Sequence, residues 1–320
     1  MHFRAIKNDN VLLCFEKGSW LQVTNLIFGR ITNGYLTVSE WFKGDCRGIE
    51  NKEMTHVKTA LKMVLKGRGT QMKYGKIIGK GNTATVYEWE EGTVLKLFVN
   101  GYPKNAVERE FLNAKAINGM NFAKPKAYEI ICCEEQMGII YDRVEGETLL
   151  DWVLKTGDLQ GCAEYMATLH KTIVQNRVSH VPDYREFLKS NILNAPSANL
   201  MEQEEVLEIL DRLKDGDTLC HGDFHPGNIL LSNGLTMVID FMNVCHGDFL
   251  YDVARTVFLV EYTPVPTDAD DRETLLRFKK ILADLYLIEM NVTREMIQDY
   301  LSVIIAARVG ECPNEYRGVR

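Results

Sequence analysis

The sequence predicts an α+β protein in three parts: a small β-plus-helix module over residues 1–70, a β-rich lobe over 71–144 and a helical lobe over 145–320. Short apolar runs broken by turn signals recur up to residue 141, which is typical of strands. Helical periodicity dominates from residue 149 onward. Hydrophobic residues make up 46% of the 320 residues, so the chain has the apolar content for more than one core.

Composition and cysteine spacing exclude several classes of protein. The N-terminus has no apolar stretch of signal-peptide length, and no segment approaches the roughly 18 consecutive apolar residues of a membrane span. The eight cysteines form no C-x-x-C pair and no zinc-site spacing. A net charge of −7 argues against a nucleic-acid partner. We expect a cytoplasmic protein with reduced thiols and no membrane or nucleic-acid partner, and the oligomeric state stays open.

The first module contains strand-like runs at residues 11–15, 20–28 and 30–38, followed by helical spacing over 50–66. Asn33-Gly34 is a strong hairpin-turn signal between two of these runs. The module carries no motif to which chemistry can be attached, so its role is not predicted.

A glycine-rich turn lies at the start of the second part. The segment 77–87 fits the pattern G-x-G-x-x-A-x-V between two strand-like runs, through Gly79, Gly81, Thr83, Ala84 and Val86. Glycines let a hairpin tip approach phosphates, and its backbone N–H groups supply donors. A strand rather than a helix follows, which excludes a dinucleotide-binding fingerprint. Taken alone, such a turn has no ligand more often than it has one.

Lys96 stands within the apolar run 94–99, and the helical segment 104–117 follows. On that helix Glu110 falls within the arc of apolar residues, whereas Glu108 falls outside it. Because an unpaired buried carboxylate is very unfavourable, Glu110 needs a cationic partner, and Lys96 is the obvious candidate. In protein kinases such a pair aims the lysine at the α- and β-phosphates of the nucleotide.

The run 138–146 reads as an apolar strand that ends in a turn at the boundary between the two lobes. In a kinase-like arrangement this is the hinge whose backbone binds the adenine edge. Asp142 and Val144 are therefore the backbone candidates for that contact.

The strongest motif is H-x-D-x-x-x-x-N, formed by His221, Asp223 and Asn228 between strand-like residues. A carboxylate at Asp223 suits contact with an attacking hydroxyl, and the amide oxygen of Asn228 suits a metal that bridges phosphates. Asp240 ends the next apolar strand, where a lone carboxylate needs a cation. Asn228 and Asp240 together fit Mg²⁺, which takes few protein ligands besides phosphates and waters. Asp252 is expected to cap a helix and to bind the backbone of the catalytic loop.

These strings, with Gly247-Asp248 and Ala167-Thr168-Leu169-His170, resemble the aminoglycoside phosphotransferase and choline kinase superfamily over about 250 residues. The resemblance implies a bilobal protein-kinase-like fold and transfer of the γ-phosphoryl group of ATP or GTP. It implies that Asp223 is the catalytic base, that Lys96 and Glu110 serve the phosphates, and that His221 and Asp252 support the loop. The segment Asp240-Phe241-Met242 departs from the D-F-G of protein kinases. A phosphorylation-switched activation loop is therefore not expected.

The acceptor is expected to be a small-molecule hydroxyl, in direct transfer without a phosphoenzyme, but its identity stays open among an aminoglycoside, an amino alcohol and a sugar. Acidic residues could attract a cationic acceptor, and aromatic residues could line a cage for an amine. These candidates are Asp268, Asp270, Asp271 and Glu273, and Trp152, Tyr251, Phe258, Tyr262 and Tyr286. A catalytically silent nucleotide-binding scaffold and an atypical protein kinase are the alternative functions.

Overall fold

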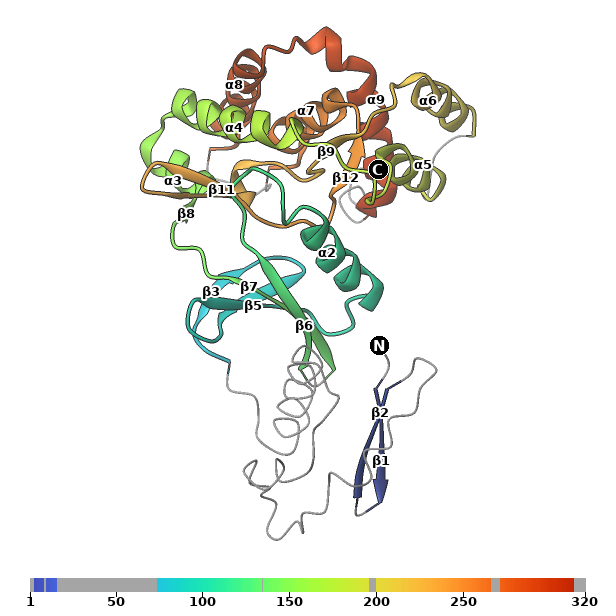
Figure 1. Cartoon of the computed structure of the whole chain (residues 1–320). Helices are drawn as coiled ribbons and strands as arrows, with labels where there is room; N and C mark the ends of the chain where they lie inside the picture. The colour runs from blue at the N-terminus through green and yellow to red at the C-terminus, as the bar shows by residue number, and fades with distance from the viewer. Residues whose placement is uncertain are drawn as a thin grey trace. The chain divides into compact units, whose positions relative to one another are not determined.

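The computed structural model describes residues 3–8, 10–15, 74–133, 135–195, 200–265 and 271–313 (Figure 1). The chain divides into two compact units, residues 1–72 and 73–320. In the first unit β1 (Phe3–Asn8) pairs antiparallel with β2 (Asn10–Phe15), so the strand predicted at 11–15 is present. The strands predicted at 20–28 and 30–38 and the helix at 50–66 lie outside the described residues.

The second unit begins with a five-stranded antiparallel sheet of order β3-β4-β5-β7-β6. Its strands are β3 (Ile77–Lys80), β4 (Ala84–Glu88), β5 (Thr93–Phe98), β6 (Ala127–Cys133) and β7 (Gln136–Asp142). Among the described residues before residue 144, the one helix of this unit is α2 (Lys104–Ala116), which contacts β6 and β7. Pro103 precedes the first turn of α2, and Val107 and Ala114 lie on the buried face of this helix. Glu110, on the same face, is therefore carried into the core.

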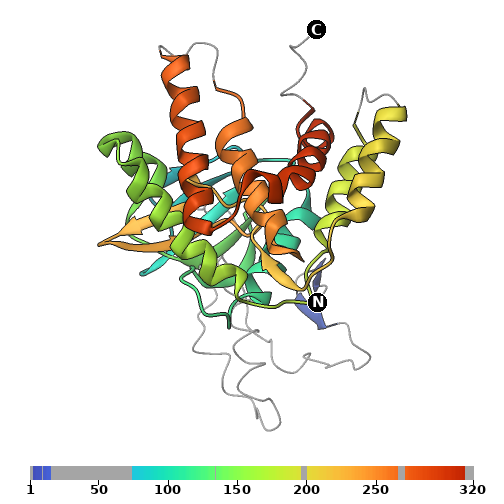
Figure 2. The ribbon, with the colours of Figure 1, turned by 90° about the horizontal axis from the view of Figure 1, so that it is seen from above.

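Helices dominate the rest of the unit. They are α3 (Leu149–Thr156), α4 (Leu159–Val174), α5 (Tyr184–Leu193), α6 (Leu200–Arg212), α7 (Phe249–Val257), α8 (Arg272–Met290) and α9 (Arg294–Glu311). A π-helical turn (Phe258–Tyr262) extends α7. From above, α4 packs along α8, and α5 and α7 both pack against α9 (Figure 2). No helix among the described residues combines the length and apolarity of a membrane span.

The helices that helical spacing predicted at 158–176, 201–214, 271–289 and 293–308 agree with α4, α6, α8 and α9. Local chemistry explains where α4 begins and where α3, the helix before it, ends. The Asp158 carboxylate accepts the N–H of Gly161 at the start of α4, and Gly157 ends α3 in the left-handed conformation at φ 72°. The predicted α+β class, with a β-rich lobe before a helical lobe, is confirmed.

Two short ladders position the candidate site. One joins β8 (Glu147–Thr148), β10 (Ile229–Ser232) and β11 (Leu235–Val238), and the other pairs β9 (Thr218–Cys220) with β12 (Cys245–Gly247). The loop 221–228 connects β9 to β10 and ends in a 3₁₀ turn (Pro226–Asn228), and the loop 239–244 connects β11 to β12. Because β9 pairs with β12 and β10 with β11, the two loops meet at one end of these ladders.

Candidate active site

The contact predicted between Lys96 and Glu110 is present. The Lys96 ammonium lies 2.8 Å from Oε1 and 3.0 Å from Oε2 of Glu110, which has no exposed surface. Tyr141, in β7, donates its hydroxyl to the same Oε1 at 2.8 Å. Burial raises the pKa of Glu110, and the charge of Lys96 and the hydrogen bonds from Lys96 and Tyr141 oppose that effect. Tyr141 was not among the predicted site residues. The sequence signal that could have identified it is a phenol at the end of an otherwise apolar strand.

Asp240 completes a chain of three charges. Its Oδ1 lies 3.1 Å from the Lys96 ammonium, so one lysine is shared by two carboxylates. Burial would lower the pKa of Lys96, but Asp240 and Glu110 together raise it well above its ordinary value. Burial would likewise raise the pKa of Asp240, but Lys96 holds it below its usual range. The structure therefore places the Lys96 ammonium between the side chains of Glu110 and Asp240.

The backbone at Asp240 is unusual for a residue with a side chain, because φ is 69°. The side chain is 30% exposed although its Oδ1 contacts Lys96, so part of it remains accessible to a ligand. Strain of this kind collects at functional sites, where the surrounding structure has to maintain it.

Asn113 supplies part of that support, and the sequence did not single it out. It lies one turn after Glu110 on α2 and is almost completely buried. Its side-chain N–H group donates to the carbonyl of Phe241 at 2.9 Å and to that of Met242 at 3.2 Å. The helix that positions Glu110 is thereby bonded directly to the segment that carries Asp240.

We expect Asn113→Ala to lower the free energy of unfolding by about 1–3 kcal/mol, because it leaves the buried Phe241 carbonyl and the partly buried Met242 carbonyl without their donor. Urea unfolding followed by circular dichroism measures this change. Asn105→Ala, an exposed asparagine on the same helix, is the matched control and should stay within about 0.5 kcal/mol of the parent chain. Equal effects of the two substitutions would show that the Asn113 bonds contribute nothing measurable.

The catalytic-loop candidates lie together on the loop 221–228. Asn228 donates its Nδ2 group to the Asp223 backbone carbonyl at 3.0 Å and to Asp223 Oδ2 at 3.1 Å. Asp223 is half-buried, and its own N–H donates to Nδ1 of His221 at 3.3 Å. Burial lowers the pKa of His221, which favours the neutral imidazole that such an acceptor requires. His221 thus supports the backbone, and the Asp223 carboxylate is held by the amide of Asn228.

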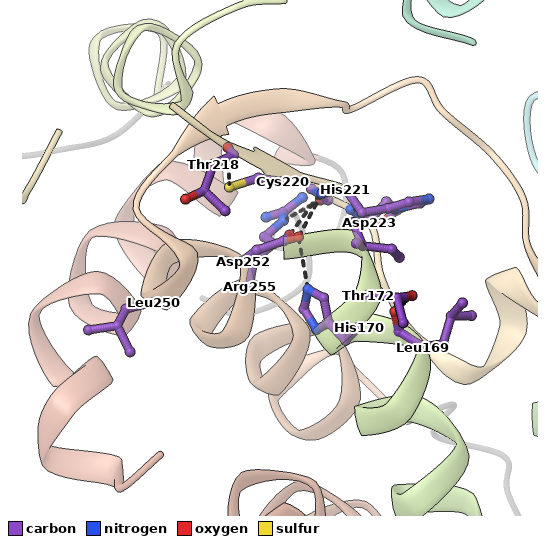
Figure 3. A network of polar contacts seen from close by, with 12 residues as sticks. Leu169, His170, Thr172, Thr218, Cys220, His221, Asp223, Leu250, Asp252 and Arg255 are labelled. Atoms are coloured by element: carbon purple, nitrogen blue, oxygen red, sulfur yellow. Dashed lines mark hydrogen bonds and ion pairs between the residues drawn. The ribbon is translucent and has the colours of Figure 1, made fainter. Parts of the chain in front are cut away.

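Asp252 is the anchor beneath this loop (Figure 3). Its carboxylate accepts the N–H of His221 at 2.6 Å, the N–H of Gly222 at 2.9 Å and the Nε2 group of His170 at 2.9 Å. Burial would raise the pKa of Asp252, but His170 and these donors hold it below its usual range. His170 comes from α4, so this contact joins three segments that are distant in sequence.

The expectation that Asp252 also caps its helix is wrong. Asp248 is the N-cap of α7, and its Oδ1 accepts the N–H of Leu250 at 2.8 Å. Asp252 lies one turn further into the helix, beyond reach of the free N–H groups at the helix start. Its carboxylate serves the loop instead.

The residues proposed to hold a metal fit Mg²⁺ in their chemistry. The Nδ2 group of Asn228 is directed at Asp223, which leaves its Oδ1 without a partner among the described residues. The backbone N–H of Ile239 donates to the Asn228 carbonyl at 3.0 Å, so Asp240 follows directly on a residue bonded to Asn228. The described residues contain no cluster of three or more His, Cys, Asp or Glu side chains suited to a metal. Two oxygen ligands suit Mg²⁺, which usually takes its remaining ligands from phosphates and water.

The glycine-rich turn is a tight connection between β3 and β4, in which the N–H of Gly81 donates to the carbonyl of Ala84 at 2.9 Å. Neither Gly79 nor Gly81 has a positive φ, and a Cβ added to either would come no closer than 3.6 Å to its neighbours. The protein itself therefore does not require glycine at these two positions. Thr83 is exposed beside them, whereas Ala84 is buried and Val86 half-buried in the sheet.

Of the two backbone positions predicted at the hinge, only one has an N–H group that is free among the described residues. The N–H of Asp142 donates to the Lys126 carbonyl at 3.0 Å, so this donor is used within the sheet. Its carboxylate accepts the N–H of Lys126 and the hydroxyl of Tyr128. The N–H of Val144 has no hydrogen-bond partner within the part of the chain that the structure describes. Val144 is thus the better placed of the two to offer a donor to a ligand.

Most acceptor candidates have structural partners. Asp271 caps α8 and Glu273 pairs with Arg277, while Asp268 and Asp270 lie outside the described residues. Among the aromatic candidates, Tyr251, Phe258 and Tyr286 are buried in the core, Trp152 packs edge-on against Tyr165, and Tyr262 is partly exposed. The described residues therefore do not form the amine cage considered from sequence.

Comparison with known proteins gives one family and one fold. Residues 75–285 match the sequence profile of the phosphotransferase enzyme family. One similar solved structure is the amicoumacin kinase hAmiN with AMP-PNP, Ca²⁺ and Ami, which is 18% identical over 83% of this chain and 89% of that chain, with a TM-score of 0.51. A second is a thermostable mutant of aminoglycoside phosphotransferase APH(4)-Ia in its apo form, which is 16% identical over 78% of this chain and 90% of that chain, with a TM-score of 0.55. A third is aminoglycoside phosphotransferase APH(3'')-Id from Streptomyces rimosus with ADP and streptomycin, which is 16% identical over 78% of this chain and 98% of that chain, with a TM-score of 0.50. At these identities the likeness shows the fold alone. No curated protein matches the chain in a sequence search.

Proposed function

The chain belongs to the phosphotransferase enzyme family, and from this premise we propose that it transfers the γ-phosphoryl group of ATP or GTP to a hydroxyl of a small molecule. The observation that carries the proposal is the Lys96 ammonium held between Glu110 and Asp240. Structures of similar fold contain AMP-PNP or ADP, which supports a nucleotide donor.

Lys96 has the geometry of a phosphate ligand. Glu110, itself held by the Tyr141 hydroxyl, fixes its ammonium on one side, and Asp240 lies on the other at 3.1 Å. The turn at Gly79 and Gly81, where no side chain covers the backbone, would let its N–H groups approach the same phosphates. The Val144 N–H would serve the nucleobase edge, together with the carbonyl of Asp142.

Asp223 is proposed to orient the acceptor hydroxyl and to take its proton. Asn228 holds the Asp223 carboxylate through Nδ2, and its Oδ1, with Asp240, would hold Mg²⁺. When bound, Mg²⁺ would neutralise charge on the phosphates. Catalysis by these residues is then positioning and electrostatic stabilisation, without a covalent enzyme intermediate.

The alternative of a silent nucleotide-binding scaffold is less consistent with these contacts. A scaffold has no use for a carboxylate at Asp223 that is held by an amide from the same loop. It also has no use for a left-handed backbone at Asp240, which is unfavourable for an aspartate. The acceptor side stays open, because the described residues do not single out an aminoglycoside, an amino alcohol or a sugar.

Nucleotide binding has a direct test. With Mg²⁺ and ATP or GTP at about 100 times the Kd, we expect the folded unit to gain about 2.7 kcal/mol of stability, read as a rise in Tm by differential scanning fluorimetry. A Lys96→Met variant should lose most of this gain, because it removes the phosphate ligand but keeps an unbranched side chain. Absence of any shift with either nucleotide would contradict the proposed function.

A further inference from the structure

Two side chains of one helix, α7, bind the backbone of Gly222, one at its N–H group and the other at its carbonyl group. Asp252 of α7 accepts the N–H of Gly222 at 2.9 Å, and Arg255, one turn later, donates its Nε group to the Gly222 carbonyl at 3.1 Å. Gly222 has a φ of 74°, and a Cβ at this position would collide with the carbonyl of Asn243. The residue before Asp223 is therefore fixed at its N–H, at its carbonyl and by steric exclusion.

Arg255 is itself fixed by the end of the last helix. The side chain is 1% exposed, and its guanidinium forms a two-pronged ion pair with Glu311: Nη1 lies 2.9 Å from Oε2 and Nη2 lies 2.5 Å from Oε1. Arg308, one turn earlier on α9, contacts the same carboxylate at 3.1 Å. Of the three guanidinium nitrogens of Arg255, Nε thus binds the catalytic loop, and Nη1 and Nη2 bind Glu311 on α9.

We propose, on the basis of the proposed function, that Arg255 and Glu311 are positioning residues for the catalytic loop. Glu311 orients the guanidinium of Arg255, and Arg255 fixes the Gly222 carbonyl and through it the backbone from which the Asp223 carboxylate projects. The C-terminal end of α9 is thereby part of the machinery that aligns the catalytic base, although it lies far from Asp223 in sequence.

Core packing alone does not account for this pair. Replacing a buried ion pair with apolar side chains of similar volume is often neutral or stabilising, so stability does not require these charges. An apolar side chain cannot donate a hydrogen bond to the Gly222 carbonyl. One double substitution that replaces both charged residues with apolar ones can therefore separate a role in core packing from a role in positioning the loop.

The test is the double variant Arg255→Met/Glu311→Met, compared with the parent chain. Positioning predicts that kcat for MgATP hydrolysis without added acceptor falls by about 10- to 100-fold while KM for MgATP stays within about twofold. Hydrogen exchange measured by mass spectrometry should show faster exchange in the peptide 218–228, with α4 (159–174) as the unchanged internal reference. Lys155→Met/Glu147→Met, which removes an exposed ion pair, is the matched control and should change neither quantity.

A double variant with parental kcat and unchanged exchange at 218–228 would overturn the proposal and leave Arg255 as a core residue only. If the double variant does not fold, Arg255→Lys takes its place, because lysine keeps a charge near Glu311 but cannot bond both partners; faster exchange at 218–228 supports positioning and unchanged exchange overturns it. The exchange measurement needs no turnover. A parent chain that hydrolyses no MgATP would thus count against the proposed function, while the exchange data still decide the positioning role.

Discussion

Replacing Asp223 with asparagine will reduce phosphoryl transfer by about 10²- to 10⁴-fold, the range expected when a positioned general base is lost. Asparagine has nearly the same shape and can still accept the hydrogen bond from Asn228 Nδ2, which is now 3.1 Å from Asp223 Oδ2. The variant therefore keeps the loop in place and removes the charge and the proton acceptor. Nucleotide affinity should stay within about twofold, because Asp223 makes no contact with Lys96 or Glu110 among the described interactions.

Steady-state transfer and isothermal titration with MgATP measure the two quantities separately. Asp217→Asn, an exposed aspartate just before β9, is the control and should match the parent chain in both. Loss of nucleotide binding in Asp223→Asn would mean that this residue belongs to the nucleotide site. Unchanged transfer would remove it from the chemistry altogether.

The second large effect is expected at Asp240. Asp240→Asn should lower turnover by about 10²- to 10³-fold, comparable to the loss of one electrostatic contact in a catalytic site. It should also remove most of the difference between MgATP and metal-free ATP in binding. Lys96 keeps its bonds to Glu110 in this variant, so the affinity for metal-free ATP should change little.

Titrations with Mg²⁺ and with EDTA distinguish these cases, and Asp211→Asn, an exposed aspartate on α6, is the control. If Asp240→Asn weakens ATP equally with and without Mg²⁺, the residue acts by orienting Lys96 and not as a metal ligand. That result would contradict the metal assignment.

Residues that follow a local pattern were within reach of the sequence. Glu110 falls in the apolar arc of its helix, which predicted both its burial and its need for Lys96. The positions of α4, α6, α8 and α9 followed from helical spacing, with ends that differ by one to three residues from the predicted ones. In each case the information lies within about twenty neighbouring residues, where periodicity and turn chemistry apply.

Contacts between segments that are distant in the chain could not be predicted from the sequence. Asn113 and Phe241, like Arg255 and Glu311, meet only when the lobes and helices pack, and local spacing carries no trace of that. Asp248 and Asp252 show the same limit. Both are aspartates near a helix start, and only the folded structure shows which one caps the helix and which one binds the catalytic loop.

The central claim is phosphoryl transfer from a nucleotide to a small-molecule hydroxyl, and one measurement tests it most directly. The full chain is incubated with Mg²⁺ and ATP or GTP labelled at the γ-phosphate, together with a panel of aminoglycosides, amino alcohols and sugars. The predicted result is label on one class of small molecule, none on the protein, and loss of transfer in Asp223→Asn. Label on the protein, or transfer that persists in Asp223→Asn, would contradict the account.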